Sequence, residues 1–415
     1  MNTDIIELKY CLDSLYLLLT GALVFWMAAG FTMLESGMVR AKNTSEILTK
    51  NIGIFCIATI CYFLFGYALA YSENPLNSFL PSFNFGVSIQ DNSIADLTNN
   101  EKPDSYSKLS FFFFQIVFVA TAMSVVSGAI AERMKIWSFF IFAMVMTSLI
   151  YPVQCYWKWG GGFLDKLGFI DYAGSGVVHL CGASAALAGV LLLGARRGKY
   201  SQSGKINAIV GANMPSVALG TWILWLGWLG FNGGSQLIIS TINDANIVAK
   251  VFCNTTISAA AGGFASSITA KIIMKKLDFT MLCNGILAGL VAITAAPDTP
   301  TLFQAMFIGL ISGVLVLFSV LFLDKLKLDD PVGAISVHGT CGIWGLIAVI
   351  FSQDDKLLPQ IIGIFSIFSF VFISSFIVWF ILKKTIGIRV EDFVEHDGID
   401  IHECGINAYP EFVKI

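Results

Sequence analysis

Two histidines in matching surroundings are the residues of this sequence best suited to chemistry. His179 follows Asp171 by eight residues in "DYAGSGVVH", and His338 follows Asp330 by eight residues in "DPVGAISVHG". A glycine stands three residues after each aspartate. Both histidines lie in apolar runs, where ionisable side chains are rare and costly. A neutral imidazole there offers one hydrogen-bond donor and one acceptor, and it can exchange a proton.

One histidine in an apolar helix is explained equally well by packing and by function. The repeated pattern favours function, because the sequence has only four histidines and the other two, His396 and His402, stand near its end. Asp171 and Asp330 are interpreted first as N-caps, since aspartate commonly accepts the free N–H groups of a helix start. For Asp171, a role in attracting a cation or transferring a proton remains open.

The elements that must position these residues are membrane helices. Hydrophobic residues make up 56% of the 415, charged residues only 13%, and the mean hydropathy is +0.76. Apolar runs of about 20 residues fit membrane helices, and alternating barrel strands are absent. We predict an all-α membrane protein with eleven transmembrane helices, at 14–34, 47–72, 109–131, 136–155, 172–194, 205–231, 247–273, 280–297, 301–324, 332–353 and 358–386.

The two histidine segments begin predicted spans five and ten, which cross in opposite directions. This predicts an inverted repeat of helices 1–5 and 6–10, followed by a peripheral eleventh helix. Eight residues at about 1.5 Å each place each histidine about 12 Å below its aspartate, near the middle of the bilayer. His179 and His338 are therefore expected to meet.

Positive charge predicts the orientation. Placing the N-terminus outside puts 18 of the 25 Lys and Arg residues on the cytoplasmic side, as the positive-inside rule requires. The C-terminus is then cytoplasmic, and we divide the chain into a transmembrane domain, 1–388, and a C-terminal tail, 389–415. No secretory signal is expected. The nine cysteines are interpreted as packing residues, and no metal site is predicted.

Several longer motifs resemble those of the ammonium transporter family, in that family's order and over nearly the whole chain. The resemblance implies an ammonium transporter of the Amt branch in the plasma or inner membrane, a homotrimer with one pore per subunit, and neither enzymatic activity nor a cofactor. The motifs are "GFTMLESGMVRAKN" (30–43), "SGAIAER" (127–133), "WGGG" (159–162), "DYAGSGVVH" (171–179), "GWLGFNGGS" (227–235) and "DPVGAISVHG" (330–339).

The same resemblance assigns residues to a substrate path. Phe118, Trp159 and Ser235 correspond to an outer site that collects ammonium ion, and aromatic ring faces attract such a cation. Below this site, the resemblance implies a gate and a hydrophobic pore lined by Phe114, Phe118, Phe231, Trp228, His179 and His338.

A dry pore would select the transported species. Ammonium ion is penalised by desolvation, whereas ammonia needs only the few hydrogen bonds that neutral imidazoles offer. The resemblance therefore implies that ammonium is deprotonated near the gate and passes as ammonia. Whether the proton follows by a separate relay, with Asp171 and the histidines as candidates, is left open.

The segment after Arg389 resembles the family's regulatory tail, which in many microbial members helps a PII-type signal protein bind. Asp400, Glu403, Gly405 and the Ala408–Tyr409 pair match, but Cys404 stands where histidine is usual. Regulation by a PII-type protein is therefore one alternative for the tail.

Two other classes of function are kept open. An ammonium receptor would use the same fold with little flux. A membrane redox protein would use His179 and His338 to ligate a haem iron.

Overall fold

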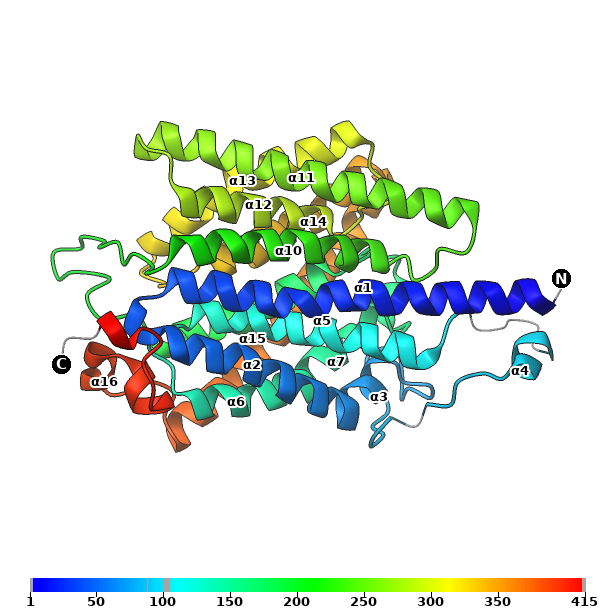
Figure 1. The fold of residues 1–415 in the computed structure, drawn as a ribbon, viewed down its shortest axis with the longest axis horizontal. Coiled ribbons are helices and arrows are strands. Elements are labelled where there is room, and N and C mark those ends of the chain that lie inside the picture. Colours follow the sequence, from blue (N-terminus) through cyan, green and yellow to red (C-terminus); the bar gives the residue numbers. More distant parts are fainter. Residues whose placement is uncertain (1–2, 88, 100–104, 413–415) are drawn as a thin grey trace.

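The structure, a computed structural model, describes residues 3–87, 89–99 and 105–412, and these residues form a helical bundle without a β-strand. The start of α1 and the segment that contains α16 lie at opposite ends of the bundle (Figure 1), here called the N-terminal end and the tail end. Lys102 and Lys414, both part of the charge count, and the last three residues of the predicted tail lie outside the described residues. The longer helices are α1 (Thr3–Met38), α2 (Thr44–Cys61), α5 (Lys108–Ala129), α6 (Ile136–Val145), α9 (Cys181–Leu193), α10 (Met214–Gly234), α11 (Ile242–Met274), α12 (Phe279–Ile293), α13 (Leu302–Lys325) and α15 (Leu357–Thr385).

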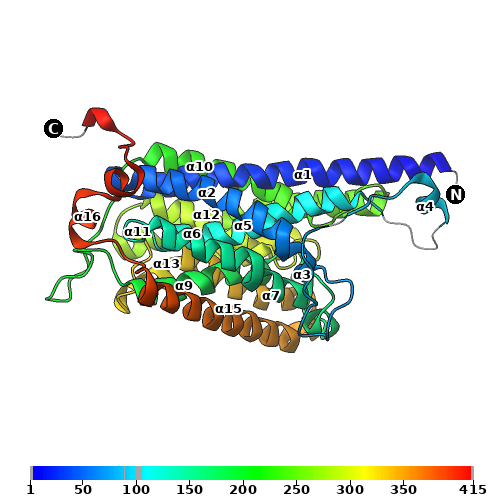
Figure 2. The same ribbon diagram turned by 90° about the horizontal axis from the view of Figure 1, so that it is seen from below.

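Nine helical stretches among the described residues are long and apolar enough to cross a membrane. Two shorter apolar stretches, Phe279–Ile293 and Ile335–Phe351, coincide with the predicted spans 280–297 and 332–353. The all-helical architecture is therefore confirmed, and the count of eleven depends on these two short helices. In Figure 2, α15 runs along one edge of the bundle, which is the place predicted for the last helix.

Four predicted helices contain wider, π-helical turns instead of continuous α-helix, and two of these turns carry the histidines. Each histidine turn follows a glycine with positive φ, 110° at Gly174 and 80° at Gly333. A π turn adds a residue to the helical turn and is common at functional sites. The turns and short helices are η1 (Ala41–Asn43), η2 (Tyr62–Gly66), α3 (Tyr67–Ala70), α4 (Ile94–Asn99), η3 (Met146–Ile150), α7 (Tyr151–Lys158), α8 (Phe163–Lys166), η4 (Ser175–Leu180), η5 (Ile335–Thr340), α14 (Cys341–Ala348), η6 (Val349–Phe351), η7 (Asp354–Lys356), α16 (Asp392–Asp397), η8 (Asp400–Cys404) and η9 (Pro410–Phe412).

Glycines allow several helices to pack with their backbones in contact. A Cβ atom at Gly220 of α10 would lie 2.4 Å from the backbone nitrogen of Leu34 in α1. A Cβ atom at Gly313 of α13 would lie 2.1 Å from the carbonyl oxygen of Gly262 in α11. Small residues serve this purpose in membranes, where packing rather than water exclusion holds helices together.

An ion-pair network at the tail end joins four segments that are far apart in the sequence. The Glu132 carboxylate lies 2.8 Å from the Arg40 guanidinium and 3.1 Å from that of Arg196, which also pairs with Asp329 at 2.8 Å. Burial raises the pKa of the Glu132 carboxyl, but the two guanidinium groups outweigh burial and hold this pKa below its usual value. The network is therefore ionised at neutral pH.

The C-terminal segment is docked against the tail end of the bundle through its carboxylates. Asp400 accepts hydrogen bonds from the backbone nitrogens of Ser45 and Glu46, both at 2.9 Å. Glu403 accepts one from the backbone nitrogen of Ile136 at 3.0 Å. The tail therefore caps the first turns of α2 and α6 from far along the chain, as the position of α16 beside them in Figure 1 illustrates.

Candidate functional site

A cavity of about 130 Å³ opens at the N-terminal end of the bundle and is lined mainly by aromatic rings; we call it the aromatic vestibule. It contains three of the residues predicted to collect substrate, Phe118, Trp159 and Ser235. No lining residue carries a formal charge, so a cation here would be attracted by ring faces and polar oxygens. The full lining is Tyr71, Phe111, Phe114, Gln115, Phe118, Trp159, Tyr172, Ser235 and Leu237.

Stacked phenylalanine rings form the floor of the aromatic vestibule. The ring centroids of Phe118 and Phe231 lie 4.2 Å apart, and the rings are nearly parallel at 28°. Trp159 meets Phe118 edge-on at 5.8 Å, and Phe114 packs against Phe118 at 4.7 Å. Four of the five aromatic residues assigned to the outer site, the gate and the pore lining are therefore brought together. Ser235 donates its hydroxyl hydrogen to the carbonyl of Phe231 at 2.8 Å, which leaves the oxygen lone pairs for a substrate.

The two predicted histidines lie behind this floor and contact each other. Their Nδ1 atoms are 3.2 Å apart, and the side chains of His179 and His338 are 0% and 3% exposed. The His179 ring stacks on Phe231 at 5.4 Å and on Trp228 at 4.9 Å. Its Nε2 atom is buried without a hydrogen-bond partner within the described part of the chain. One imidazole must donate to the other, so both can be neutral, and Nε2 of His179 remains available to a small polar molecule.

Asp171 and Asp330 both bond to the backbone at the start of a histidine turn. The Asp171 carboxylate accepts from the backbone nitrogens of Gly174, Gly176 and Val177 at 2.7–3.2 Å. Asp330 accepts from the nitrogens at positions 333–335 at 2.7–3.1 Å. These bonds are those of a helix cap, and they fix the two histidine turns in the same way.

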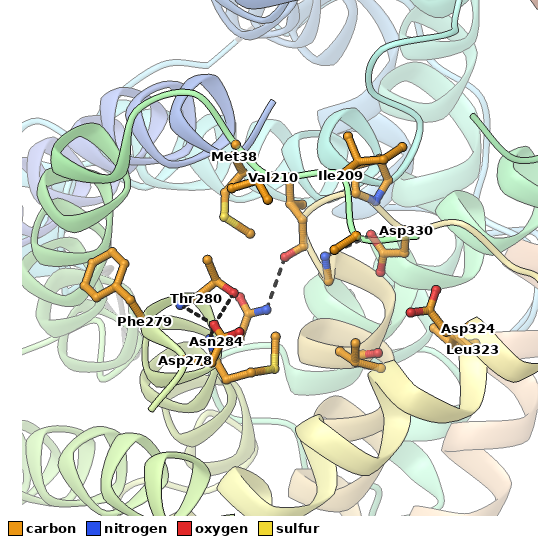
Figure 3. A pocket seen from close by; sticks show the side chains of 18 of the residues that line it. Met38, Ile209, Val210, Asp278, Phe279, Thr280, Asn284, Leu323, Asp324 and Asp330 are labelled. Carbon is orange, nitrogen blue, oxygen red and sulfur yellow. Dashed lines mark hydrogen bonds between the residues drawn. The ribbon is translucent and has the colours of Figure 1, made fainter. Parts of the chain in front are cut away.

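A larger cavity of about 460 Å³ opens at the opposite end, among the loops near the tail; we call it the tail-end vestibule. Figure 3 shows Asp278, Asp324 and Asp330 around it, together with the Asn284 amide, which donates to the carbonyl of Val332 at 3.3 Å. Our sequence interpretation did not predict this vestibule. Its lining comes from three loops and helix ends that no local pattern connects.

The site does not fit a haem iron between the histidines. Two imidazoles ligating one metal ion from opposite sides, at about 2 Å each, need their nitrogens about 4 Å apart. The 3.2 Å between the Nδ1 atoms of His179 and His338 is a hydrogen-bond distance instead. The described residues also contain no group of three or more acidic, Cys or His side chains placed to hold a metal ion.

Three polar residues of the aromatic vestibule were missed by our sequence interpretation. Gln115 Oε1 and the Tyr71 hydroxyl are buried without a hydrogen-bond partner in the described ranges, and the Tyr172 hydroxyl donates to Gln236 at 2.7 Å. Gln115 lies one residue after Phe114, in the otherwise apolar stretch 111–120, and this polar residue was the signal available in the sequence.

Comparisons with known proteins identify the family of this chain. The model of the Ammonium Transporter Family matches residues 15–409. A Synechocystis sp. protein whose name includes the words ammonium transporter is 43% identical over 411 residues, which cover 97% of this chain and 90% of that protein. Ammonium transporter Amt2 of Archaeoglobus fulgidus is 38% identical over 436 residues, covering 97% of this chain and 89% of that protein.

Solved structures show the same fold. A structure described as "Sensor Amt Protein" superposes with a TM-score of 0.87 at 34% identity, covering 96% of this chain and 99% of the other. Mep2 of Candida albicans superposes with a TM-score of 0.80 at 25% identity, covering 94% and 88%. With a family match across most of its length and relatives well above 30% identity, this chain belongs to the Ammonium Transporter Family.

Proposed function

We propose that this protein conducts ammonium nitrogen across the membrane by taking up ammonium ion in the aromatic vestibule and passing ammonia along the histidine pair. One observation carries the proposal. A buried pair, His179 and His338, lies behind the vestibule's stacked rings with a 3.2 Å contact, and the Nε2 atom of His179 has no hydrogen-bond partner among the described residues. Transport by this chain is also in keeping with the names of its relatives.

Recruitment is assigned to Trp159, Phe118 and Ser235. A cation that loses part of its hydration gains about 1–2 kcal/mol from aromatic faces within about 6 Å. The oxygens of Ser235, Gln115 and Tyr71, which line the cavity, can accept its N–H groups. Potassium would share the ring attraction but would not donate hydrogen bonds, so this lining favours ammonium.

Passage requires that ammonium give its proton to water in the aromatic vestibule, so that hydronium stays there while ammonia moves beyond the stacked rings. The ion would have to enter an apolar channel where its charge is unpaired, whereas ammonia needs only one or two hydrogen bonds. His179 Nε2 supplies such a contact beyond Phe231. Potassium has no proton to release and meets the full cost of desolvation. Asp171, which is bonded to three backbone nitrogens, has the capping role in this proposal and a proton-transfer role as its alternative.

We propose the remaining architecture on the same basis. The chain crosses the bilayer eleven times, with Phe279–Ile293 and Ile335–Phe351 as short crossings, and spans 1–5 and 6–10 are inverted repeats. The matching η4 and η5 turns support the repeat. The N-terminus is outside, the tail at 389–415 is a cytoplasmic regulatory segment after a 1–388 transporter domain, and three chains form the homotrimer. A PII-type protein is the candidate partner at the tail end.

A receptor that carries little flux is the competing function, and measured flux separates the two. We would reconstitute the protein in liposomes, apply an ammonium pulse, and record the current together with the signal of a pH-sensitive dye inside. Ammonium-selective flux that depends on His179 and His338, with potassium inactive, is expected. If the wild type gave no current and no dye response, the proposal would be overturned.

A further inference from the structure

The carboxyl group of Glu35 is buried beside the path that leads from the histidines to the tail end. Glu35 is 1% exposed and lies in α1. It lines a cavity of about 20 Å³ together with His338, Ser124, Gly128 and Asn284. A volume of this size holds one water-sized molecule, and ammonia and ammonium are of that size.

This cavity, here called the Glu35 cavity, lies between two regions already described. His338 connects it to the histidine pair, and Asn284 and Val332 line both it and the tail-end vestibule. Figure 3 shows Asn284 on the side of the tail-end vestibule, and its amide donates to the carbonyl of Val332 at 3.3 Å. The Glu35 cavity therefore adjoins both the histidine pair and the tail-end vestibule.

Within the described residues, both side-chain hydrogen bonds to Glu35 go to the same oxygen, which leaves the other oxygen for a molecule in the cavity. Asn51 Nδ2 donates to Oε2 at 3.2 Å, and the Ser127 hydroxyl donates to the same oxygen at 2.8 Å. At Gly128, an added Cβ atom would lie 3.5 Å from the Glu35 carboxyl carbon, so the carboxyl group packs directly on bare backbone. Oε1 is the oxygen available to the cavity.

The charges around Glu35 do not balance without a proton or a bound cation. In α2, the Lys50 ammonium pairs with Glu46 at 2.8 Å, and both side chains are fully buried. Glu35 is then a second carboxyl beside a single ammonium group. The other ionisable groups nearby are His338 at the cavity, and Glu132 and Asp400, which face Glu46 from the end of α5 and from the tail. An unpaired charge in such an environment is strongly disfavoured.

We propose that the Glu35 cavity is a second substrate site, at which Glu35 returns a proton to ammonia that has passed the histidines. This inference rests on the proposed function. The O–H bond of the carboxylic acid breaks, the proton joins the nitrogen lone pair, and an ammonium–carboxylate pair results. The charge of the cluster is the same before and after this step. Ammonium then leaves through the tail-end vestibule, and the carboxylate takes a proton from a hydronium ion of the water there, releasing water.

Infrared difference spectroscopy of the reconstituted protein tests the site directly. Adding ammonium chloride to the wild type should remove the carbonyl band of a protonated carboxyl and produce a carboxylate band, whereas potassium chloride should not. Glu35→Gln should abolish this difference. Glu73→Gln, which changes an exposed carboxyl in a loop, should retain it. The proposal is overturned if the wild type shows no such difference, or if Glu35→Gln shows the same one.

Flux adds a second readout. Glu35→Gln should lower flux by about a hundredfold, the low end of what a positioned proton donor contributes, and should flatten its dependence on pH at the tail end. If wild-type flux depends on the histidines but Glu35→Gln changes neither the flux nor its pH profile, the Glu35 site alone is overturned. The absence of any flux in the wild type overturns the proposed function instead.

A milder variant covers the case in which Glu35→Gln does not fold. Ser127→Ala removes the hydroxyl that stabilises the carboxylate, so more ammonium should be needed to remove the protonated band. An unchanged ammonium dependence in a folded Ser127→Ala variant would contradict the assignment of that band to Glu35.

Discussion

The two vestibules differ in size and in charge. The aromatic vestibule holds about 130 Å³ among uncharged side chains, whereas the tail-end vestibule holds about 460 Å³ and is lined by aspartates and by Arg196 and Lys199. A small aromatic chamber can hold a partly dehydrated cation through ring faces, while a wide charged chamber keeps ions hydrated. In the proposed function, this difference assigns selection to the N-terminal end and release to the tail end.

The largest effect should come from removing the histidine pair between the two vestibules. Changing both His179 and His338 to alanine removes the polar contacts of the dry path, so ammonium-selective flux should fall by about a hundredfold or lose its selectivity over potassium. Flux into proteoliposomes, with His396→Ala as the matched change at an exposed histidine, is the measurement. A folded double variant with normal selective flux would contradict the role of the pair.

A smaller effect should follow from making the aromatic vestibule less aromatic. Replacing both Phe118 and Trp159 by alanine removes about 2 kcal/mol of cation–π attraction, which is about a 30-fold rise in the half-saturating ammonium concentration. Phe365→Ala, at an exposed phenylalanine of α15, controls for loss of bulk. Equal half-saturation in the double variant and in the wild type would show that the rings do not collect the cation.

A change in the C-terminal tail should alter the tail end of the bundle without altering the aromatic vestibule. Asp400→Asn weakens the cap of α2, at a cost of about 1 kcal/mol, so the first turn of α2 should exchange amide hydrogens faster. The aromatic vestibule should bind ammonium as before. Asp397→Asn, an exposed neighbour, is the control. If the amide hydrogens of Ser45 and Glu46 exchanged at the same rate in both variants, Asp400 would not cap α2 in the reconstituted protein.

The smallest effect should be on the stability of the folded protein at low pH. Because guanidinium groups hold the pKa of Glu132 below its usual value of about 4.3, its ion pairs stabilise the folded protein above that pH. This contribution is lost as the pH falls through the lowered pKa. The unfolding temperature in detergent should therefore drop in strong acid, and Glu132→Gln should reduce the drop. An identical pH dependence in the variant would rule out Glu132 as a source.

Local patterns predicted a large part of the molecule but only some of the site. Hydropathy predicts the helices because lipid forces every backbone group into internal hydrogen bonds. The spacing from Asp171 to His179 and from Asp330 to His338 pointed to a contact, since each pattern is contained in one segment. The wide turns η4 and η5 were not predicted, because their hydrogen bonding depends on neighbouring helices. Gln115 and Glu35 were missed as site residues because only the folded bundle shows which cavities they line.

The capping of α2 and α6 by Asp400 and Glu403 has a consequence for how the protein is made. These caps are 355 and 267 residues away from the backbone groups that they satisfy. During synthesis, both helices leave the ribosome long before either carboxylate exists. A chain that stops short of Asp400 can insert its membrane segments and still lack both caps, so the capped first turns of α2 and α6 form only after translation has passed Glu403.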